Sequence, residues 1–325
     1  MAGRVREVTG RGSSPYFLYR QASIFHGIII QITGWGGDTM SKKVFVGNYK
    51  GGVGKTTSTY NLAVELAKNY EKKILLIDLD SQSSLSEVCM TAYGKPLNEL
   101  AKNETLNYIY TVYMQSKKIG NINFTLQSNK VIKTINSIDF IPNSLFSDFG
   151  GLDKISIDIG NSIENLLVLR DLIEDNNLNN KYDFIFFDCP PSNNVITQSA
   201  FLYSDYYLIP TIMDPLSIRG VKHYISVIEK FYENYCVKNE NADVLSLVFG
   251  DEPKLIGVFE TMRKGNTNTK IYREAMKEFS GYLFTAEIKD RKDVSETMGT
   301  GNETNYYEYL ELAKEFLKRI KEMER

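Results

Sequence analysis

The stretch NYKGGVGKTTSTYNLA, residues 48–63, places three glycines and two lysines just before a run of helix-forming residues. Most of it fits the pattern G-x-x-x-x-G-K-[ST], a turn whose backbone N–H groups cradle phosphates before a helix begins. Tyr49 stands where that pattern has its first glycine, and a second lysine, Lys50, follows it. The extra cation is the feature that the rest of the sequence must explain.

The loop carries the groups that hold the phosphates of a nucleotide. Its glycines let the backbone turn tightly and present N–H groups inward, and the helix that follows adds partial positive charge. Lys55 can reach the β- and γ-phosphates, and the Thr56 hydroxyl is placed to bind Mg²⁺. We therefore predict that the loop binds a nucleotide and Mg²⁺. The predicted nucleotide-binding residues of the loop are Gly51, Gly52, Val53, Gly54, Lys55, Thr56 and Thr57.

Short apolar runs recur along the chain, each followed by turn residues and a helical stretch. Strands that are apolar on both faces and alternate with helices are typical of a parallel sheet that is covered on both sides. The pattern predicts an α/β fold of the P-loop NTPase type, with a doubly wound, mostly parallel sheet and helices on both faces. The predicted strands are 44–46, 74–78, 138–142, 183–188, 206–210, 255–259 and 282–288.

Helices are predicted at four places. The first follows the loop over residues 55–69, with apolar residues spaced to face the sheet, and the others cover 162–175, 218–235 and 305–323. Residues 91–137 are polar and rich in asparagine, and they indicate an insertion over the top of the sheet.

Residues 1–39 differ in composition from the rest of the chain. They hold four arginines against two acidic residues, clusters of glycine and serine, and the chain's one tryptophan. An Arg-rich start is compatible with a transit peptide, but no amphipathic pattern follows it. Met40 begins MSKKVFVGNYKGG, which enters a strand and the loop at once. We expect residues 1–39 to be a leader or a disordered extension, and residues 40–325 to be a single P-loop ATPase domain.

The overall composition limits the partners and the compartment. The net charge of −2 argues against a chain that coats nucleic acid or anionic membrane with its whole surface, although a local basic patch stays possible. Three widely spaced cysteines and two histidines make no recognisable metal set. Because the cysteines are far apart and show no C-x-x-C spacing, we expect a reduced, cytoplasmic protein. No run of eighteen apolar residues occurs, so no spanning helix is expected.

Carboxylates follow two of the predicted strands, at the edge where a phosphate loop needs them. Asp188 ends DFIFFD, an apolar strand that closes on an acid, as in a metal-linked carboxylate of a P-loop enzyme. Asp78 and Asp80 stand two residues apart in ILLIDLDSQSS and so project to the same side. Each acid alone could be a helix cap or a turn former, which is the commoner use of such residues. The three together favour a site that holds a metal and orients water, with Thr56 and Asp188 as the predicted metal-linked residues.

The segments KGGVGKT, DLDSQSS and DFIFFDCPPS together resemble the ParA family of DNA-partition ATPases, a branch of the deviant Walker-A class that includes MinD. The likeness covers roughly residues 42–320. Lys50 occupies the signature lysine position of that family. The resemblance implies an ATP-sandwich homodimer in which Lys50 contacts phosphates bound by the partner subunit, in the manner of an arginine finger.

The same resemblance assigns roles to the carboxylates. Asp80 is implied to position the attacking water, which with Lys50 and Lys55 completes the catalytic set. Asp78 would support the magnesium shell, and Asp188 would hold Mg²⁺ through water. Serines stand where the family often has Pro, Gly and Asn after Asp80, which leaves the detail of that loop open. The implied base site is Thr261, Met262 and Arg263.

Within this class two functions compete. The family resemblance favours DNA partition by a nucleoid-associated protein, with a centromere-binding ParB-type protein as partner and non-specific DNA as ligand. The alternative is a MinD-like positioning ATPase, whose last helix lies on a membrane. Here the last predicted helix mixes Glu and Lys around its apolar stripe, so a membrane partner is disfavoured.

A third possibility, a regulator that binds nucleotide without hydrolysis, would lose Asp80, which this chain keeps. For the favoured function, DNA contact is expected from basic residues of the C-terminal half that act collectively. The candidates are Lys222, Lys230, Arg263, Lys264, Lys270 and Arg273.

Overall fold

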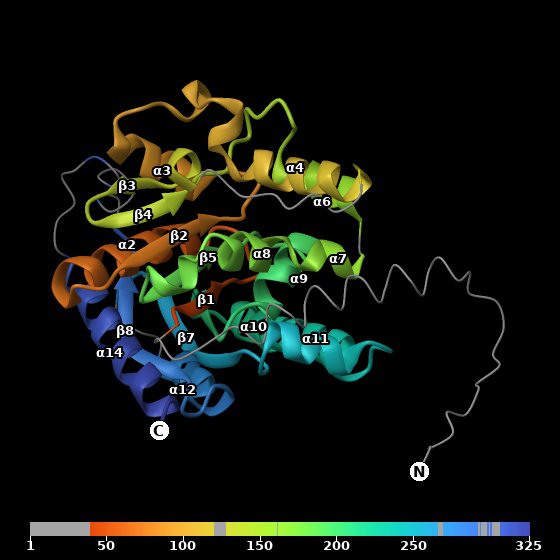
Figure 1. Ribbon diagram of the computed structural model, residues 1–325. Helices are drawn as coiled ribbons and strands as arrows, with labels where there is room; N and C mark the ends of the chain where they lie inside the picture. The colour runs from red at the N-terminus through yellow and green to blue at the C-terminus, as the bar shows by residue number, and fades with distance from the viewer. Residues whose placement is uncertain are drawn as a thin grey trace, which may run out of the picture.

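The computed structural model describes residues 40–119, 128–160, 162–265 and 269–291, positions 293, 298 and 300, and residues 306–325. Eight described strands form one sheet in the order β3-β4-β2-β5-β1-β6-β7-β8 (Figure 1). Every pairing is parallel except that of β3 with β4. The strands are β1 (Lys42–Val46), β2 (Ile74–Asp78), β3 (Lys133–Ile135), β4 (Ile138–Ile141), β5 (Phe184–Asp188), β6 (Tyr206–Thr211), β7 (Lys254–Arg263) and β8 (Leu283–Lys289).

The doubly wound, mostly parallel α/β fold is confirmed. All seven predicted strands are present, and the central ones, β1, β2 and β5, are buried along nearly their whole length. The sequence missed β3, which has only three residues and pairs antiparallel with β4 at the edge of the sheet. The register places Asp78 opposite Asp188, with Val46 on the other side of Asp188. The carboxyl ends of three neighbouring strands therefore meet beside the loop that follows β1.

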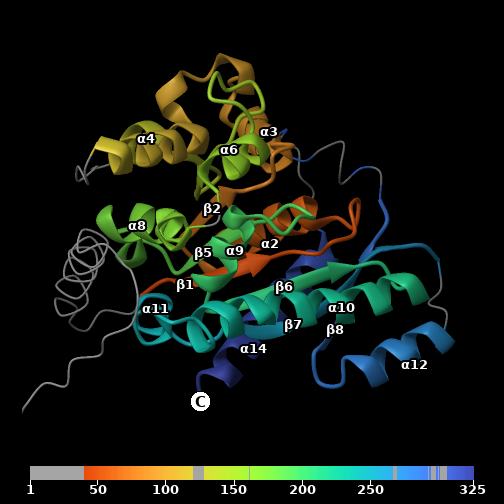
Figure 2. The same cartoon turned by 90° about the vertical axis from the view of Figure 1, so that its right-hand side faces the viewer.

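Helices cover both faces of the sheet. On one face α2 (Lys55–Tyr70), α3 (Ser84–Tyr93) and α14 (Tyr307–Met323) pack into one buried core, with Phe316 of α14 against Phe184 and Phe186. Figure 2 shows α10 (Pro215–Tyr232) and α12 (Thr269–Glu278) on the opposite side of β6, β7 and β8. That second face is completed by α4 (Leu106–Ile119), α6 (Leu152–Ile159), α7 (Ile163–Leu166), α8 (Val168–Asp175), α9 (Val195–Leu202) and α11 (Ala242–Phe249).

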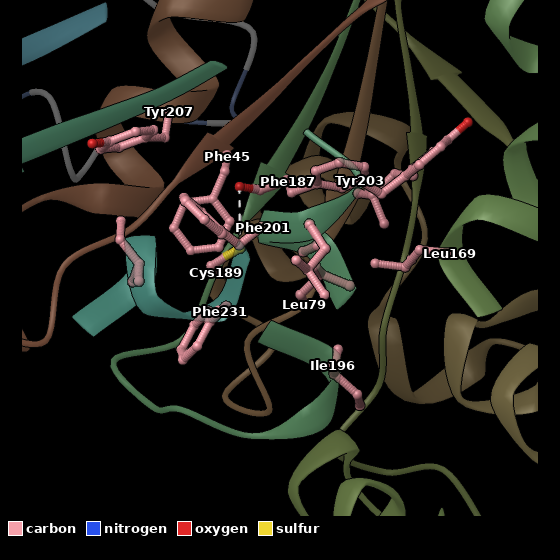
Figure 3. Close-up of a cluster of buried hydrophobic side chains, with 14 of the residues drawn as sticks. Phe45, Leu79, Leu169, Phe187, Cys189, Ile196, Phe201, Tyr203, Tyr207 and Phe231 are labelled. Carbon is pink, nitrogen blue, oxygen red and sulfur yellow. Dashed lines mark hydrogen bonds between the residues drawn. The ribbon is translucent and has the colours of Figure 1, made fainter. Parts of the chain in front are cut away.

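The core of the second face is built on aromatic contacts. Phe201 of α9 meets the ring of Phe45 edge-on at 5.6 Å and also contacts Tyr207 and Phe231 (Figure 3). Cys189 is fully buried beside them, and its Sγ lies 3.5 Å from the carbonyl oxygen of Phe187. Cys189 is thus a small packing residue directly below the strand end that carries Asp188.

The predicted helices differ from the observed ones mainly at their ends. The segment 162–175 divides into α7 and α8, and the helix expected at 218–235 begins earlier, because Asp214 caps it and Pro215 fits its first turn. The C-terminal helix starts at Tyr307; residue 305 lies outside the described residues. Seven described α-helices were not predicted: α3, α4, α5 (Ser128–Val131), α6, α9, α11 and α12.

The polar segment 91–137 is more ordered than its composition indicates. Its described part contains α4, α5 (Ser128–Val131), β3 and two short 3₁₀ turns. Leu106, Ile109 and Tyr110 of α4 are buried in the same core as α6 and α8. Among the described helices, none is long and apolar enough to cross a membrane.

Candidate active site

The loop between β1 and α2 has the backbone shape of a phosphate cradle. Gly52 and Gly54 adopt left-handed φ values of 67° and 71°, which L side chains rarely adopt. Gly54 is also the N-cap of α2, and Val53 is fully buried under the loop. The Val53 carbonyl accepts a hydrogen bond from the Thr261 hydroxyl at 2.8 Å. A neighbouring strand therefore fixes the loop from below.

A cavity of 540 Å³ opens above this loop. The loop glycines, Lys55, Thr56 and Thr57 form one wall, and Asp80 and Gln82 approach from the loop after β2. Thr261 and Met262, two of the three residues predicted for the base site, line it from β7. The end of β8 and α14 complete it with residues that the sequence did not indicate: Ile288, Lys289, Asp290, Arg291 and Tyr309.

Thr56 and Asp188 meet at the base of the loop. The Thr56 hydroxyl donates to Asp188 Oδ2 at 2.7 Å, and the Thr59 hydroxyl lies 3.4 Å from Oδ1. Burial raises the pKa of Asp188 to about 7, against the hydrogen bond from Thr56, which lowers it. Burial likewise lowers the pKa of Lys55, while the charges of Asp188 and Asp80 oppose that shift. These oxygen donors next to the phosphate cradle fit Mg²⁺, a hard cation that prefers oxygen ligands.

Asp78 is buried deeper than its expected role suggests. Its Oδ2 accepts hydrogen bonds from the backbone N–H and hydroxyl of Ser86, at 2.8 and 2.6 Å, and its Oδ1 accepts from the N–H of Asp80. Burial, and then the charge of Asp188, raise the pKa of Asp78 to about 8. In this structure Asp78 fixes the start of α3 and the backbone at Asp80.

The loop that carries Asp80 is held by Asn143, a residue that the sequence analysis missed. Asn143 follows β4 and is fully buried, and its side-chain amide donates to the Asp80 carbonyl. Its Oδ1 accepts from the hydroxyl of Ser83, which has a left-handed φ of 56°. The asparagine that directly follows IDFIP was the available signal, because polar residues at strand ends of such sheets gather at the site.

The predicted base site is only partly assembled. Thr261 is buried and supports the loop, and Met262, with a left-handed φ of 53°, lines the cavity. Arg263 does not line it; its guanidinium pairs with Glu287 of β8. Glu287 of β8 therefore pairs with the arginine that was predicted to contact the base of the nucleotide.

Lys50 also lies outside its own cavity. Its ammonium donates hydrogen bonds to Asp214 Oδ2 at 2.9 Å and to the Ser217 hydroxyl at 2.7 Å, both at the start of α10. The ring of Tyr49, in the place of the missing glycine, packs edge-on against Tyr224 of α10 at 4.6 Å. The two lysines of the loop therefore point to different places, Lys55 to the cavity and Lys50 to α10.

Comparison with known proteins identifies the family. A family model described as "AAA domain" matches residues 41–244. The virulence plasmid ParA family protein of Chlamydia psittaci is 30% identical over 283 residues, which cover 85% of this chain and 92% of that protein. The chain belongs to the ParA family. The chromosome partitioning protein ParA of Caulobacter vibrioides is 25% identical, over 84% of this chain and 93% of that protein. The sporulation initiation inhibitor protein Soj of Bacillus subtilis is 26% identical, over 85% of this chain and 98% of that protein.

Solved structures agree with this fold. A putative plasmid partition protein of Borrelia burgdorferi bound to AMPPNP has a TM-score of 0.61 and 23% identity, over 87% of this chain and 99% of its own. Cobyrinic acid a,c-diamide synthase of Mycobacterium smegmatis, with an ATP analog and magnesium, has a TM-score of 0.62 and 19% identity, over 86% and 96%. This ParA-family chain is thus a P-loop ATPase.

Proposed function

We propose that this chain is a DNA-segregation ATPase that partitions a plasmid or chromosome. ATP closes two copies into a sandwich homodimer, the dimer binds DNA non-specifically, and a centromere-binding ParB-type protein stimulates hydrolysis and release. The main observation in support of a homodimer is the position of Lys50. It belongs to the phosphate loop, yet its ammonium points away from the cavity that Lys55 serves.

Lys50 is suited to a site on a second copy. Its side chain keeps 44% exposure, so it is not a core residue, and it stands at the mouth of the loop beside the exposed Gly51 and Gly52. A cation delivered to the γ-phosphate from a neighbouring subunit stabilises the charge that develops in the transition state. Hydrolysis would then require assembly.

Within one subunit the remaining groups divide the work. Lys55 and the loop amides would bind the phosphates, and Thr56 and Asp188 would hold Mg²⁺, which neutralises charge on the β- and γ-oxygens. Asp80, on a loop fixed by Asn143 and Asp78, would orient the attacking water. Met262 and the end of β8 would enclose the base.

The candidate DNA contacts gather on α10, α12 and the loop after β7. Lys222 and Lys230 of α10 and Lys270 and Arg273 of α12 are exposed on helices that contact each other (Figure 2). Lys264 is exposed as well and pairs with Asp290 at 3.3 Å, and Arg263 is engaged with Glu287. A homodimer would present this surface twice, and affinity would rise through avidity with a steep dependence on salt. We place this activity in residues 40–325, at the nucleoid in the cytoplasm.

The packing of α14 argues against the MinD-like alternative. Its apolar stripe, Tyr309, Leu312, Phe316 and Ile320, is at most 3% exposed and packs on the sheet and α2. A helix whose apolar face is already buried has none left to insert into a membrane interface.

A DNA gel shift and a vesicle sedimentation run in parallel test the proposal, each with and without ATP. We expect ATP-dependent retention of DNA at low salt and no sedimentation with anionic vesicles. Lys230→Glu should weaken the DNA shift, whereas Lys314→Glu, on the exposed face of α14, should not. ATP-dependent sedimentation without a DNA shift would refute partition in favour of the membrane function.

A further inference from the structure

Lys50 is held by its own chain at a specific place. Its backbone N–H donates to Asn48 Oδ1 at 3.0 Å, and the Asn48 amide donates to the carbonyl of Pro210 on β6 at 2.9 Å. These bonds direct the start of the loop toward the β6–α10 connection. The Lys50 ammonium then reaches Asp214 and Ser217, 164 and 167 residues away in the sequence.

The acceptor at this place is a fixed anion. Asp214 Oδ1 caps α10 by accepting from the N–H groups of Leu216 and Ser217, at 3.0 and 2.9 Å, which leaves Oδ2 for Lys50 and the Ser217 hydroxyl. The hydrogen bonds from Ser217 and Lys50 hold the pKa of Asp214 down to about 2, against its partial burial. A carboxylate at a helix N-terminus is also favoured by the helix dipole. Asp214 therefore stays charged at any working pH.

We propose that Asp214 and Ser217 are positioning residues that hold the Lys50 ammonium at the start of α10 until a second copy with bound nucleotide brings its phosphates within reach. The inference rests on the proposed trans role of Lys50. Two of the three N–H donors of the ammonium are engaged at α10, so the ammonium can serve a phosphate on another subunit fully only by releasing these bonds when the dimer closes. Asp214 and the phosphates thus compete for one cation.

This competition sets the protein concentration at which two copies pair. The Lys50–Asp214 pair is partly exposed, with side chains 44% and 34% accessible, so it is weak enough to break. A γ-phosphate, with two negative charges against one on the carboxylate, is the stronger partner for the ammonium. Without the hydrogen bonds to Asp214 and Ser217, the Lys50 ammonium would be free to bind the phosphates of a second copy, and copies would pair at lower protein concentration.

The first experiment measures the contact itself, without nucleotide. The full chain is acylated with a trace of acetic anhydride, and the labelling of each lysine is quantified by mass spectrometry. Asp214→Asn keeps a side-chain oxygen to cap α10 but removes the charge. Ser217→Ala removes one acceptor of the Lys50 ammonium, and with it the hydroxyl bond to Asp214 Oδ2, but keeps the charge of the carboxylate. Glu278→Gln is the matched control, because it frees Lys222, a paired lysine that lies on α10 itself, and leaves Lys50 in place.

We expect Lys50 labelling to rise about fivefold in Asp214→Asn, as for loss of an exposed charge-assisted bond, and less in Ser217→Ala. Lys222 labelling should rise only in Glu278→Gln. Unchanged Lys50 labelling in Asp214→Asn, with the Lys222 response intact, would overturn the inference whatever the dimer does.

The second experiment follows ATP turnover against protein concentration. Asp214→Asn should reach half of its maximal specific activity at several-fold lower concentration than the natural chain, and the change should vanish in a Lys50→Ala background. Raised Lys50 labelling with superimposable activity curves would contradict the trans role while leaving the contact proven. The two experiments therefore distinguish absence of the Lys50 contact with Asp214 and Ser217 from failure of the proposed function.

Discussion

Replacing Asp188 by Asn should change how the stability of the nucleotide-free protein depends on pH. Asp188 is 1% exposed, and burial raises its pKa from 3.8 to about 7. A carboxyl whose folded-state pKa is raised contributes stability that is fully present below its unfolded pKa and is lost as pH rises through the folded pKa. The natural chain should therefore lose stability from about pH 4 up to about pH 7.

The magnitude follows from the two pKa values. Because one pKa unit corresponds to about 1.4 kcal/mol, Asp188 costs the fold about 4 kcal/mol at pH 8, where it is ionised, and less than about 2 kcal/mol at pH 5, where the folded state keeps it protonated. Asn keeps an acceptor for the Thr56 hydroxyl and carries no charge. The charge of Asp188 also raises the pKa of Asp78, so its removal lowers the cost of ionising that second carboxyl.

Urea unfolding followed by circular dichroism at pH 5, 6, 7 and 8 measures this effect. The free energy of unfolding of Asp188→Asn, minus that of the natural chain, should grow by about 3 kcal/mol between pH 5 and pH 8. Asp243→Asn, an exposed carboxylate on α11, serves as the control and should leave the pH dependence unchanged. Parallel stability curves for Asp188→Asn and the natural chain would refute the burial argument.

Three further substitutions probe the site and the fold. Asp80→Ala should trap an ATP-bound dimer that does not turn over, seen as an ATP-dependent shift in gel filtration; a monomer with ATP would count against its role. Gly54→Ala, at a φ of 71°, should strain the loop by about 1–2 kcal/mol and weaken ATP binding tenfold or more in a nucleotide titration, whereas Gly51→Ala, with ordinary backbone, should weaken it less. Phe316→Ala should cost about 3–5 kcal/mol of unfolding free energy, and an effect below 1 kcal/mol would mean that α14 is not core.

The sequence predicted the sheet and the loop well because both are local signals. A central strand that is apolar on both faces is visible in five residues, as in Ile74–Asp78, and the glycines show the turn directly. β3 was missed because three residues of mixed polarity, Lys133–Ile135, become a strand only beside β4.

Side-chain contacts between segments that are distant in the chain could not be predicted from the sequence. Arg263 carries no sign that Glu287 will pair with it from the neighbouring strand. Nothing in the loop reveals that Asp214 receives Lys50, because the two meet only when β6 lies beside β1. Asn143 gave a weak signal at a strand end, and its hold on Asp80 depends on β4 and β2 being neighbours.

The most direct test of the account mixes two inactive variants, Lys50→Ala and Asp80→Ala, and measures ATP turnover. In a sandwich dimer, one site of each mixed pair combines the intact Asp80 of one subunit with the Lys50 of the other. Random pairing makes half of the dimers mixed, so the mixture should regain about a quarter of natural activity. Each variant alone should stay inactive. If Lys50 instead serves the nucleotide of its own chain, every subunit lacks one essential group, and a mixture as inactive as its components would contradict the central claim.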